Sequence, residues 1–457
     1  MRETGSSLDS GERFLLEQGK AVGAEARKQF PTGKMMLPHQ RSIPNQLAKE
    51  LDSAAQGQVF FEAEFLSDHC VARPDILRRE GSGWHLIEVK SGTAPKKEYI
   101  EDVAYTLMVL EDIGLPVSKV SLMLLAPEYE IDQPSHLRFF EEDVTADARE
   151  AANRFRLEKK KLVDALLQDK QPRKNLIYAC KNCSFYSDCF GDELTSPVFF
   201  LPGINERQFQ RIVEQGYKEI PAVPDLLLNS PKQISTKQAV THNKQVVHRQ
   251  KLQEVLNEVQ WPAYYLDFES CALAMPQVSR VRPYEQMPVQ YSLHVFSAPN
   301  KLERHEEFLG NPGEDCRDSL CRQLLSQVGA TGSIVVYSSF EKTILRSLGD
   351  RLPQHQSSLE ALSERLFDLR RVFSEAVFHP SCQGKESIKH TLPAFTNLSY
   401  EDLSIQNGYQ AIAEFQRMGQ PGITADQVAK IRRDLLAYCK RDTLAMASLH
   451  FAMLNLA

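Results

Sequence analysis

The sequence predicts a mixed α/β protein in which two α/β regions flank a small helical connector. Segments with the two-residue period of strands alternate with segments of helical period in residues 12–168, and again in residues 263–454. The stretch between them, from about residue 200 to 260, is short, helical and polar in pattern. A chain of 457 residues that is 42% hydrophobic can bury two or three separate cores.

The first α/β region begins with a predicted helix over residues 12–30. Three predicted strands follow, the last two separated by a turn at Gly81 and Gly83. A helix, a strand and a long charged helix complete the region, and residues 169–174 (DKQPRK) have the composition of a linker. The predicted ranges are 59–65, 70–78 and 84–90 for the three strands, then 96–112 (helix), 119–126 (strand) and 143–168 (helix).

The second α/β region is predicted to contain strands at residues 263–269, 289–297 and 333–337 and to end on a helix over residues 425–454. Thr424 and Gln427 match the capping-box pattern, which places the start of that helix. With the cysteine-bearing segment assigned to the first region, the expected domains are residues 1–192, a connector at 193–260, and residues 261–457.

Composition excludes several classes of protein. No run of eighteen apolar residues occurs, and the first thirty residues carry charges throughout, so we expect no membrane span, no secretory signal and a cytoplasmic location. The formal net charge of -6 disfavours simple electrostatic binding of nucleic acid. A site in which carboxylates hold cations would nevertheless attract phosphate, because the bound cations reverse the local field.

Two carboxylates lie two residues apart on the first strand of the second region. In AYYLDFES, Asp267 and Glu269 project from the same face of a hydrophobic strand. Like charges placed side by side destabilise a strand unless a cation lies between them, and a divalent metal is the usual partner. The alternative is an edge strand with one solvated acidic face.

Three further acidic positions in this region follow strands or lie on the last helix. Glu341 in SIVVYSSFEK follows an apolar strand at a helix start, and Tyr438 and Asp442 in YCKRD share one face of the last helix. The alternative for Tyr438 and Asp442 is a buried hydrogen-bonded pair. Asp368 in LFDLRR is a weaker candidate, for which an acid at a helix N-terminus is the simpler interpretation.

Taken in order, these motifs resemble those of RNase H-like 3′-5′ exonucleases of the DnaQ-like and polymerase-proofreading type. The resemblance covers about residues 261–457 and rests on D-x-E, on an acid after Phe, and on Y-x3-D. It implies two Mg²⁺ or Mn²⁺ ions held by Asp267, Glu269, Glu341 and Asp442, with Tyr438 orienting the attacking water. Glu341 replaces the usual Asp, and Ala437 occupies the position where another subclass has a His base.

A second acidic pattern occurs in the first region. Pro74-Asp75 is followed, thirteen residues after the Asp, by Glu88-Val89-Lys90, which is the spacing of a PD-(D/E)xK nuclease site. Asp75 and Glu88 would hold Mg²⁺, and Lys90 would stabilise charge that develops on phosphate. The alternative is a chance pairing, because an Asp and an ExK pair in adjacent strands are common.

Further motifs in residues 12–192 resemble the iron-sulfur RecB-like nucleases. Glu25, in GKAVGAEARKQF, resembles the first acidic motif of those enzymes, and IEVKSG resembles the third. The resemblance implies a [4Fe-4S] cluster on the C-x2-C-x5-C motif Cys180, Cys183 and Cys189. The chain has no Cys before Cys70 to supply a fourth ligand, and Tyr105 stands where the family has Gln. An incomplete cluster, zinc and reduced thiols therefore stay open.

Both halves together resemble a bacterial and phage family of double nucleases, to which PYEQMPVQYSLHVF and GKESIKHTLPAF are also similar. We therefore expect a metal-dependent nuclease that acts on nucleic-acid ends, with DNA as the expected partner. The alternative is a nucleic-acid-binding scaffold whose N-terminal site has decayed. Action on RNA also stays open, because an RNase H-like site does not by itself select the sugar.

Overall fold

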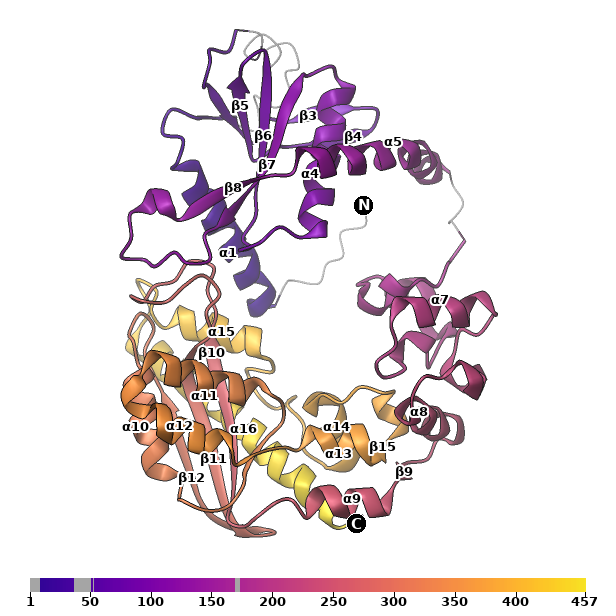
Figure 1. The fold of residues 1–457 in the computed structure, drawn as a ribbon, viewed down its shortest axis with the longest axis vertical. Helices are drawn as coiled ribbons and strands as arrows, with labels where there is room; N and C mark the ends of the chain where they lie inside the picture. The colour runs from indigo at the N-terminus through magenta and orange to yellow at the C-terminus, as the bar shows by residue number, and fades with distance from the viewer. Residues whose placement is uncertain (1–8, 37–50, 52, 169–172) are drawn as a thin grey trace. The chain divides into compact units, whose positions relative to one another are not determined.

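A computed structural model describes residues 9–36, 51, 53–168 and 173–457, and the chain divides into two compact units (Figure 1). Unit 1 comprises residues 1–172 together with 271–287, and unit 2 comprises residues 173–270 and 288–457. The division therefore falls between Pro172 and Arg173, and the cysteine-bearing segment is part of unit 2. The first four residues of the predicted linker, 169–172, lie outside the described residues.

Unit 1 is built on a mixed six-stranded sheet in the order β1-β2-β5-β6-β7-β8. Its two parallel pairs are β1 with β2 and β6 with β7, and the remaining pairs are antiparallel. A short hairpin, β3 and β4, lies outside this sheet. The strands are β1 Lys34–Met35, β2 Val59–Phe61, β3 Phe65–Ser67, β4 Cys70–Ala72, β5 Ile76–Glu80, β6 Gly83–Val89, β7 Val117–Leu125 and β8 Phe139–Asp143.

Helices cover both faces of this sheet. The helix α4 (Lys97–Asp112) and the start of α5 (Thr145–Leu167) pack with Trp84 and Leu86 of β6 in the main core of the unit. On the opposite face, Ala26 of α1 (Ser10–Arg27) packs with Ile87. Side chains of β6 thus alternate between the two helical layers, as the period of a strand requires.

Two strands predicted in unit 1 are each divided in the structure. The predicted strand 59–65 stops after Phe61, because Glu62 has a positive φ of 57° that a strand cannot continue through. The predicted strand 70–78 consists of β4 and β5, separated at Arg73 to Asp75. The strand β8, which directly precedes α5, was not predicted.

Unit 2 contains a five-stranded sheet in the order β12-β11-β10-β13-β14. The strand β10 lies in the middle and runs parallel to β13, which runs parallel to β14, while β12 is antiparallel to β11. These strands are β10 Ala263–Cys271, β11 Met287–Ala298, β12 Lys301–Leu309, β13 Ile334–Val336 and β14 Leu366–Asp368. The first, second and fourth of them confirm predicted strands, whereas β12 and β14 were not predicted.

Each face of the unit 2 sheet is covered by helices. Tyr264, Leu266 and Phe268 of β10 pack into a core with α10 (Arg317–Gln327), α11 (Phe340–Arg351) and α12 (Gln356–Ser363). The alternate residue Tyr265 bonds His450 of α16 (Ala425–Leu454), 2.7 Å away, on the other face. The capping box between Thr424 and Gln427 is present, which confirms the predicted helix start.

The connector and the cysteine segment form a small helical subcluster of unit 2. Leu176, Phe190, Val198, Phe199 and Phe209 belong to its buried core. Its elements include α6 Tyr186–Phe190, α7 Glu206–Glu214 and α8 Pro231–His242. The next helix, α9 Arg249–Leu256, contacts α16 instead. The strand β9 (Val246–Val247) pairs with β15 (Val377–Phe378), which ties this subcluster to the C-terminal region. No helix in the described ranges combines the length and apolarity needed to cross a membrane.

Candidate metal centre

The strand β10 directs Asp267 and Glu269 toward α16. They continue the row that starts at Tyr265, whose hydroxyl bonds His450 of that helix. Because β10 is flanked by β11 and β13, it is not an edge strand. The alternative of a solvated acidic face on a sheet edge therefore does not describe these two residues.

Asp442 on α16 meets the two carboxylates of β10. One ligand atom from each of Asp267, Glu269 and Asp442 lies within 4.8 Å of the other two. Asp442 is buried, and the two strand residues are half-buried. The structure thus brings Asp442 to two acids that lie about 175 residues earlier in the sequence. A set made only of carboxylate oxygens suits Mg²⁺ or Mn²⁺.

Burial raises the pKa of every carboxyl group in this cluster, and repulsion from neighbouring acids adds to the increase at Asp267 and Glu269. Burial, with the neighbouring acids, raises the pKa of Asp267 well above its usual value. Burial and the charge of Asp442 raise the pKa of Glu269 to about 8, while the ammonium of Lys389 opposes the increase. Burial raises the pKa of Asp442 to about 6. Without a cation these acids cannot all be ionised near neutral pH, and a divalent ion would remove that cost.

Glu341 lies in the first turn of α11, directly after β13, and is buried. Burial, with the charges of Asp368 and Asp442, raises its pKa to about 7. Glu341 does not belong to the group whose ligand atoms lie within 4.8 Å of one another. It still lies near that group, since the charge of Asp442 acts on it. Ser338 Oγ donates to Glu341 Oε2 at 3.4 Å, which leaves the carboxylate weakly held.

Asp368 ends β14 and is half-buried near Glu341. Burial raises its pKa, and its Oδ1 accepts the backbone N–H of Arg370 at 2.9 Å. Arg370 is the first residue of α13 (Arg370–Glu375), so Asp368 lies two residues before a helix and accepts a hydrogen bond from the first residue of that helix. This supports the simpler interpretation of Asp368, although its charge still acts on Glu341.

Two tyrosines and a cysteine surround Asp442 and Asp267. Tyr438 is hydrogen-bonded to Asp442, as the alternative interpretation of this pair required. The hydroxyl of Tyr400 also donates to Asp442 Oδ1, at 2.5 Å. Cys439 Sγ donates to Asp267 Oδ2 at 3.6 Å. Sequence reasoning missed Tyr400, because it lies in an irregular segment with no motif to mark it.

The N-terminal acids Asp75 and Glu88 also meet. Asp75 Oδ2 accepts the backbone N–H of Val89 at 2.8 Å, and Lys90 Nζ donates to Glu88 Oε1 at 3.0 Å. Burial and the charge of Asp75 raise the pKa of Glu88 to about 8. Glu88 Oε2 is buried without a hydrogen-bond partner. A bound cation could coordinate this oxygen. Asp75, Glu88 and Lys90 therefore lie together in one cluster.

Glu25 is engaged elsewhere in unit 1. Its carboxylate pairs with Arg138 and Lys28, and the hydrogen bond from Lys28 helps to lower its pKa. The acids that act on the Asp75 cluster are instead Glu62, which helps to raise the pKa of Asp75, and Asp102, which pairs with Lys90. The contacts of Glu25 are therefore with two basic side chains, Arg138 and Lys28.

Cys180, Cys183 and Cys189 lie in the helical subcluster of unit 2. Cys180 and Cys189 pack against its apolar core, and Cys183 is exposed. In the described part of the chain, the acids of unit 2 are the group whose ligand atoms lie within 4.8 Å of one another, and no cysteine belongs to it. A [4Fe-4S] cluster holds its cysteine sulfurs farther apart than that, so the cluster that the resemblance implies stays a prediction.

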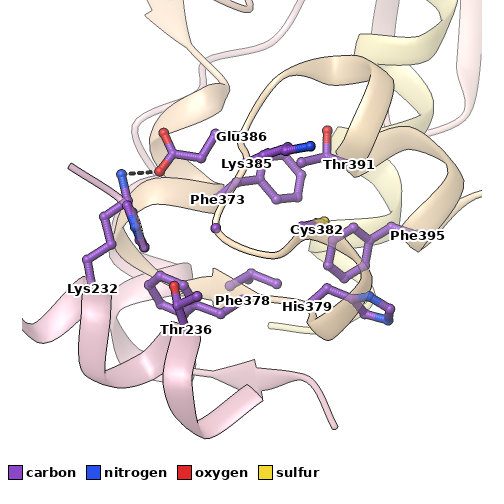
Figure 2. Close-up of a pocket in the computed structure, with 13 residues that line it drawn as sticks. Lys232, Thr236, Phe373, Phe378, His379, Cys382, Lys385, Glu386, Thr391 and Phe395 are labelled. Carbon is purple, nitrogen blue, oxygen red and sulfur yellow. Dashed lines mark ion pairs between the residues drawn. The ribbon is translucent and has the colours of Figure 1, made fainter. Parts of the chain in front are cut away.

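A pocket elsewhere in unit 2 differs in chemistry from the acidic cluster (Figure 2). Its walls are largely apolar, and the single carboxylate on them, Glu386, is paired with Lys232. Three phenylalanines line it, namely Phe373, Phe378 and Phe395. None of the clustered acids contributes to its walls, so this pocket is not the candidate metal centre.

Comparisons with known proteins give a partial match to a family model and no activity. A family model described as a domain of unknown function (DUF2779) matches residues 264–387. The matched range contains Asp267, Glu269 and Glu341 but ends before Asp442. A protein of Mycoplasma pneumoniae named "Uncharacterized protein MG366 homolog" is 27% identical over 228 residues, which is 44% of this chain. The chain covers only 33% of that relative's length. No match to a solved structure was found.

Proposed function

We propose that this chain is a metal-dependent nuclease whose principal site is the acidic cluster of unit 2. The observation that carries the proposal is the approach of Asp267, Glu269 and Asp442 to within 4.8 Å of one another. An enclosed group of three acids with raised pKa values is unfavourable unless it binds cations. The parallel strands β10, β13 and β14, with acids inside β10, after β13 and at the end of β14, support the RNase H-like assignment.

The residues present would hold divalent ions through carboxylate oxygens. Mg²⁺ or Mn²⁺ bound there would polarise the phosphate and lower the pKa of a water molecule. Asp267, Glu269 and Asp442 would be the closest ligands, and Glu341 would complete the set from α11. Tyr438 is hydrogen-bonded to Asp442, so its hydroxyl is held where it could orient a water molecule.

The proposed substrate is a nucleic-acid end, with DNA as the first candidate. A labelled single-stranded DNA oligonucleotide should be shortened by the purified chain in Mn²⁺ or Mg²⁺ and not in excess EDTA. Asp442→Asn should abolish most of this activity, because the amide is a poor ligand for a hard cation. Asp426→Asn is the matched control, since Asp426 is an exposed acid on the same helix.

Two results would overturn this proposal. One is intact DNA and intact RNA after incubation of the wild-type chain with either ion. The other is equal digestion by the wild type and by an Asp267→Ala Asp75→Ala double variant, because that result would point to a contaminating nuclease.

The cluster in unit 1 supports a second hydrolytic site of the PD-(D/E)xK type. Asp75 and Glu88 would hold a divalent ion, and Lys90 would stabilise negative charge on phosphate. The unpartnered Oε2 of Glu88 favours this role, because a buried carboxylate oxygen without a donor is costly in the absence of a cation. The competing function is a nucleic-acid-binding scaffold. It is favoured by Tyr105, which stands in place of the Gln of the related nucleases.

A further inference from the structure

Lys389 provides an uncompensated positive charge at the acidic cluster. Its ammonium acts on both Glu269 and Asp442, whose pKa values it lowers against the effect of burial. The second cation near Asp442 is Arg441, which forms two hydrogen bonds to the carboxylate of Asp402, at 2.9 and 2.7 Å. Lys389 Nζ instead donates to a neutral acceptor, the carbonyl oxygen of Gln406, at 2.7 Å.

The bond to Gln406 fixes this ammonium beside the carboxylates. Lys389 lies in the first turn of α14 (Ile388–Phe395), and Gln406 lies two residues before α15 (Gly408–Arg417). Both helices pack against α16, which carries Asp442. A Cβ atom added at Gly408 would lie 3.9 Å from Glu269 Oε2, so the segment that holds Lys389 also lines Glu269.

Exposure distinguishes Lys389 from the acids. Lys389 is exposed to solvent, whereas Asp442 and Glu341 are buried. A ligand that arrives from solution can therefore reach the ammonium directly. The bond to the Gln406 carbonyl also limits the freedom of the long side chain, so less entropy is lost when a ligand binds.

The charge balance indicates what that ligand is. Two divalent ions would neutralise the four carboxylates of Asp267, Glu269, Glu341 and Asp442, leaving the charge of Lys389 in excess. An excess cation next to bound metal ions attracts an anion, and each linkage of a nucleic acid carries one negative charge.

We propose that Lys389 binds a phosphate of the substrate strand next to the scissile one, and so determines how tightly the strand is held. This inference rests on the proposed function, because it takes the substrate to be a polyanion. It makes Lys389 a substrate-binding residue that acts on affinity more than on the chemical step. Loss of a phosphate contact of this kind weakens binding about equally for all base sequences.

The test compares Lys389→Ala and Lys389→Arg with the wild type on one single-stranded oligonucleotide. Lys389→Ala should raise KM by about three- to tenfold, change kcat less than about twofold, and reduce the slope of log affinity against log salt by about 0.7. Lys389→Arg should restore KM. Lys430→Ala is the matched control, since Lys430 is an exposed lysine of α16 that pairs with Asp434.

Equilibrium binding separates this inference from the nuclease proposal. Fluorescence anisotropy with a labelled oligonucleotide in Ca²⁺ needs no turnover. If the wild type binds the oligonucleotide in Ca²⁺ but cuts it in neither Mg²⁺ nor Mn²⁺, and Lys389→Ala binds more weakly, the nuclease proposal is wrong and the Lys389 contact holds. If Lys389→Ala binds as tightly as the wild type, or if kcat falls while KM is unchanged, the Lys389 contact is wrong.

Discussion

The hydroxyl of Tyr400 donates a hydrogen bond to Oδ1 of Asp442 at 2.5 Å, and both residues are buried. A tyrosine from the segment between α14 and α15 therefore fixes the orientation of a carboxylate on α16. The contact also stabilises the ionised form of Asp442, since it lowers a pKa that burial raises. Partners of this kind, one shell beyond a metal ion, strongly influence metal affinity.

Tyr400→Phe should weaken metal binding and make it more dependent on pH. Without this donor the pKa of Asp442 rises further above about 6, so a larger fraction of the ligand is protonated in weak acid. We expect the Mn²⁺ concentration for half-maximal activity to increase about tenfold at pH 6.5, and by less at pH 8.5. Tyr409→Phe is the control, because Tyr409 is 59% exposed. An unchanged Mn²⁺ requirement at both pH values would contradict this role.

The metal-free protein should lose stability as the pH rises from about 4.5 to about 8. The pKa of Glu269 is raised to about 8 in the folded chain, so in this range the folded state binds more protons than the unfolded state. Thermal melting in EDTA should show a smaller decrease for Glu269→Gln than for the wild type, since the amide does not ionise. Saturating Mn²⁺ should also reduce the decrease. Parallel melting curves of the variant and the wild type would contradict the expectation.

Separate variants should show whether both clusters hydrolyse nucleic acid. We expect Lys90→Ala and Asp442→Asn each to remove part of the total activity, and the double variant to remove at least 95% of it. The remaining single-site activities should differ in substrate, which gels of single-stranded and duplex DNA would show. If Lys90→Ala retains all activity, the unit 1 cluster is not catalytic and the scaffold interpretation holds for that half.

Iron and labile sulfide analysis should show far fewer than four atoms of each per chain. The reason is that Cys180, Cys183 and Cys189 supply three cysteine ligands, whereas the sequence has no Cys before Cys70 to supply the fourth. Protein purified without oxygen is needed, together with its visible spectrum. Four iron and four sulfide per chain, lost in Cys183→Ser, would contradict this expectation and support the resemblance to iron-sulfur nucleases.

Local patterns predicted the elements that carry the acids. The two-residue period of AYYLDFES is enough to place Asp267 and Glu269 on one face of β10, because side-chain direction in a strand depends on position alone. The capping box at Thr424 likewise gives the start of α16. The strand β12 was missed because its sequence, KLERHEEFL, is largely exposed and polar, and pairing with β11 is what makes it a strand.

Predicting the unit 1 cluster was only partly possible. Asp75 directly precedes β5, Glu88 lies in β6, and Lys90 directly follows β6. Because β5 and β6 form a hairpin, the three side chains could be expected to lie close together. Glu25 was assigned by resemblance, and the direction in which a helix presents a side chain depends on how that helix packs. In the structure that side chain meets Arg138.

The sequence by itself determined which side chains alternate between the two faces of each strand and where the main helices begin. It also determined which acids stand at the spacing of known motifs. Only the tertiary structure decided that Tyr400 and Lys389 join the acids, that Glu62 acts on Asp75, and that Glu25 pairs with Arg138. The physical reason is the distance along the chain over which each kind of interaction acts. Periodicity and capping depend on neighbours within a few residues, whereas a charge cluster depends on packing between segments far apart in the chain, and no local pattern encodes that distance.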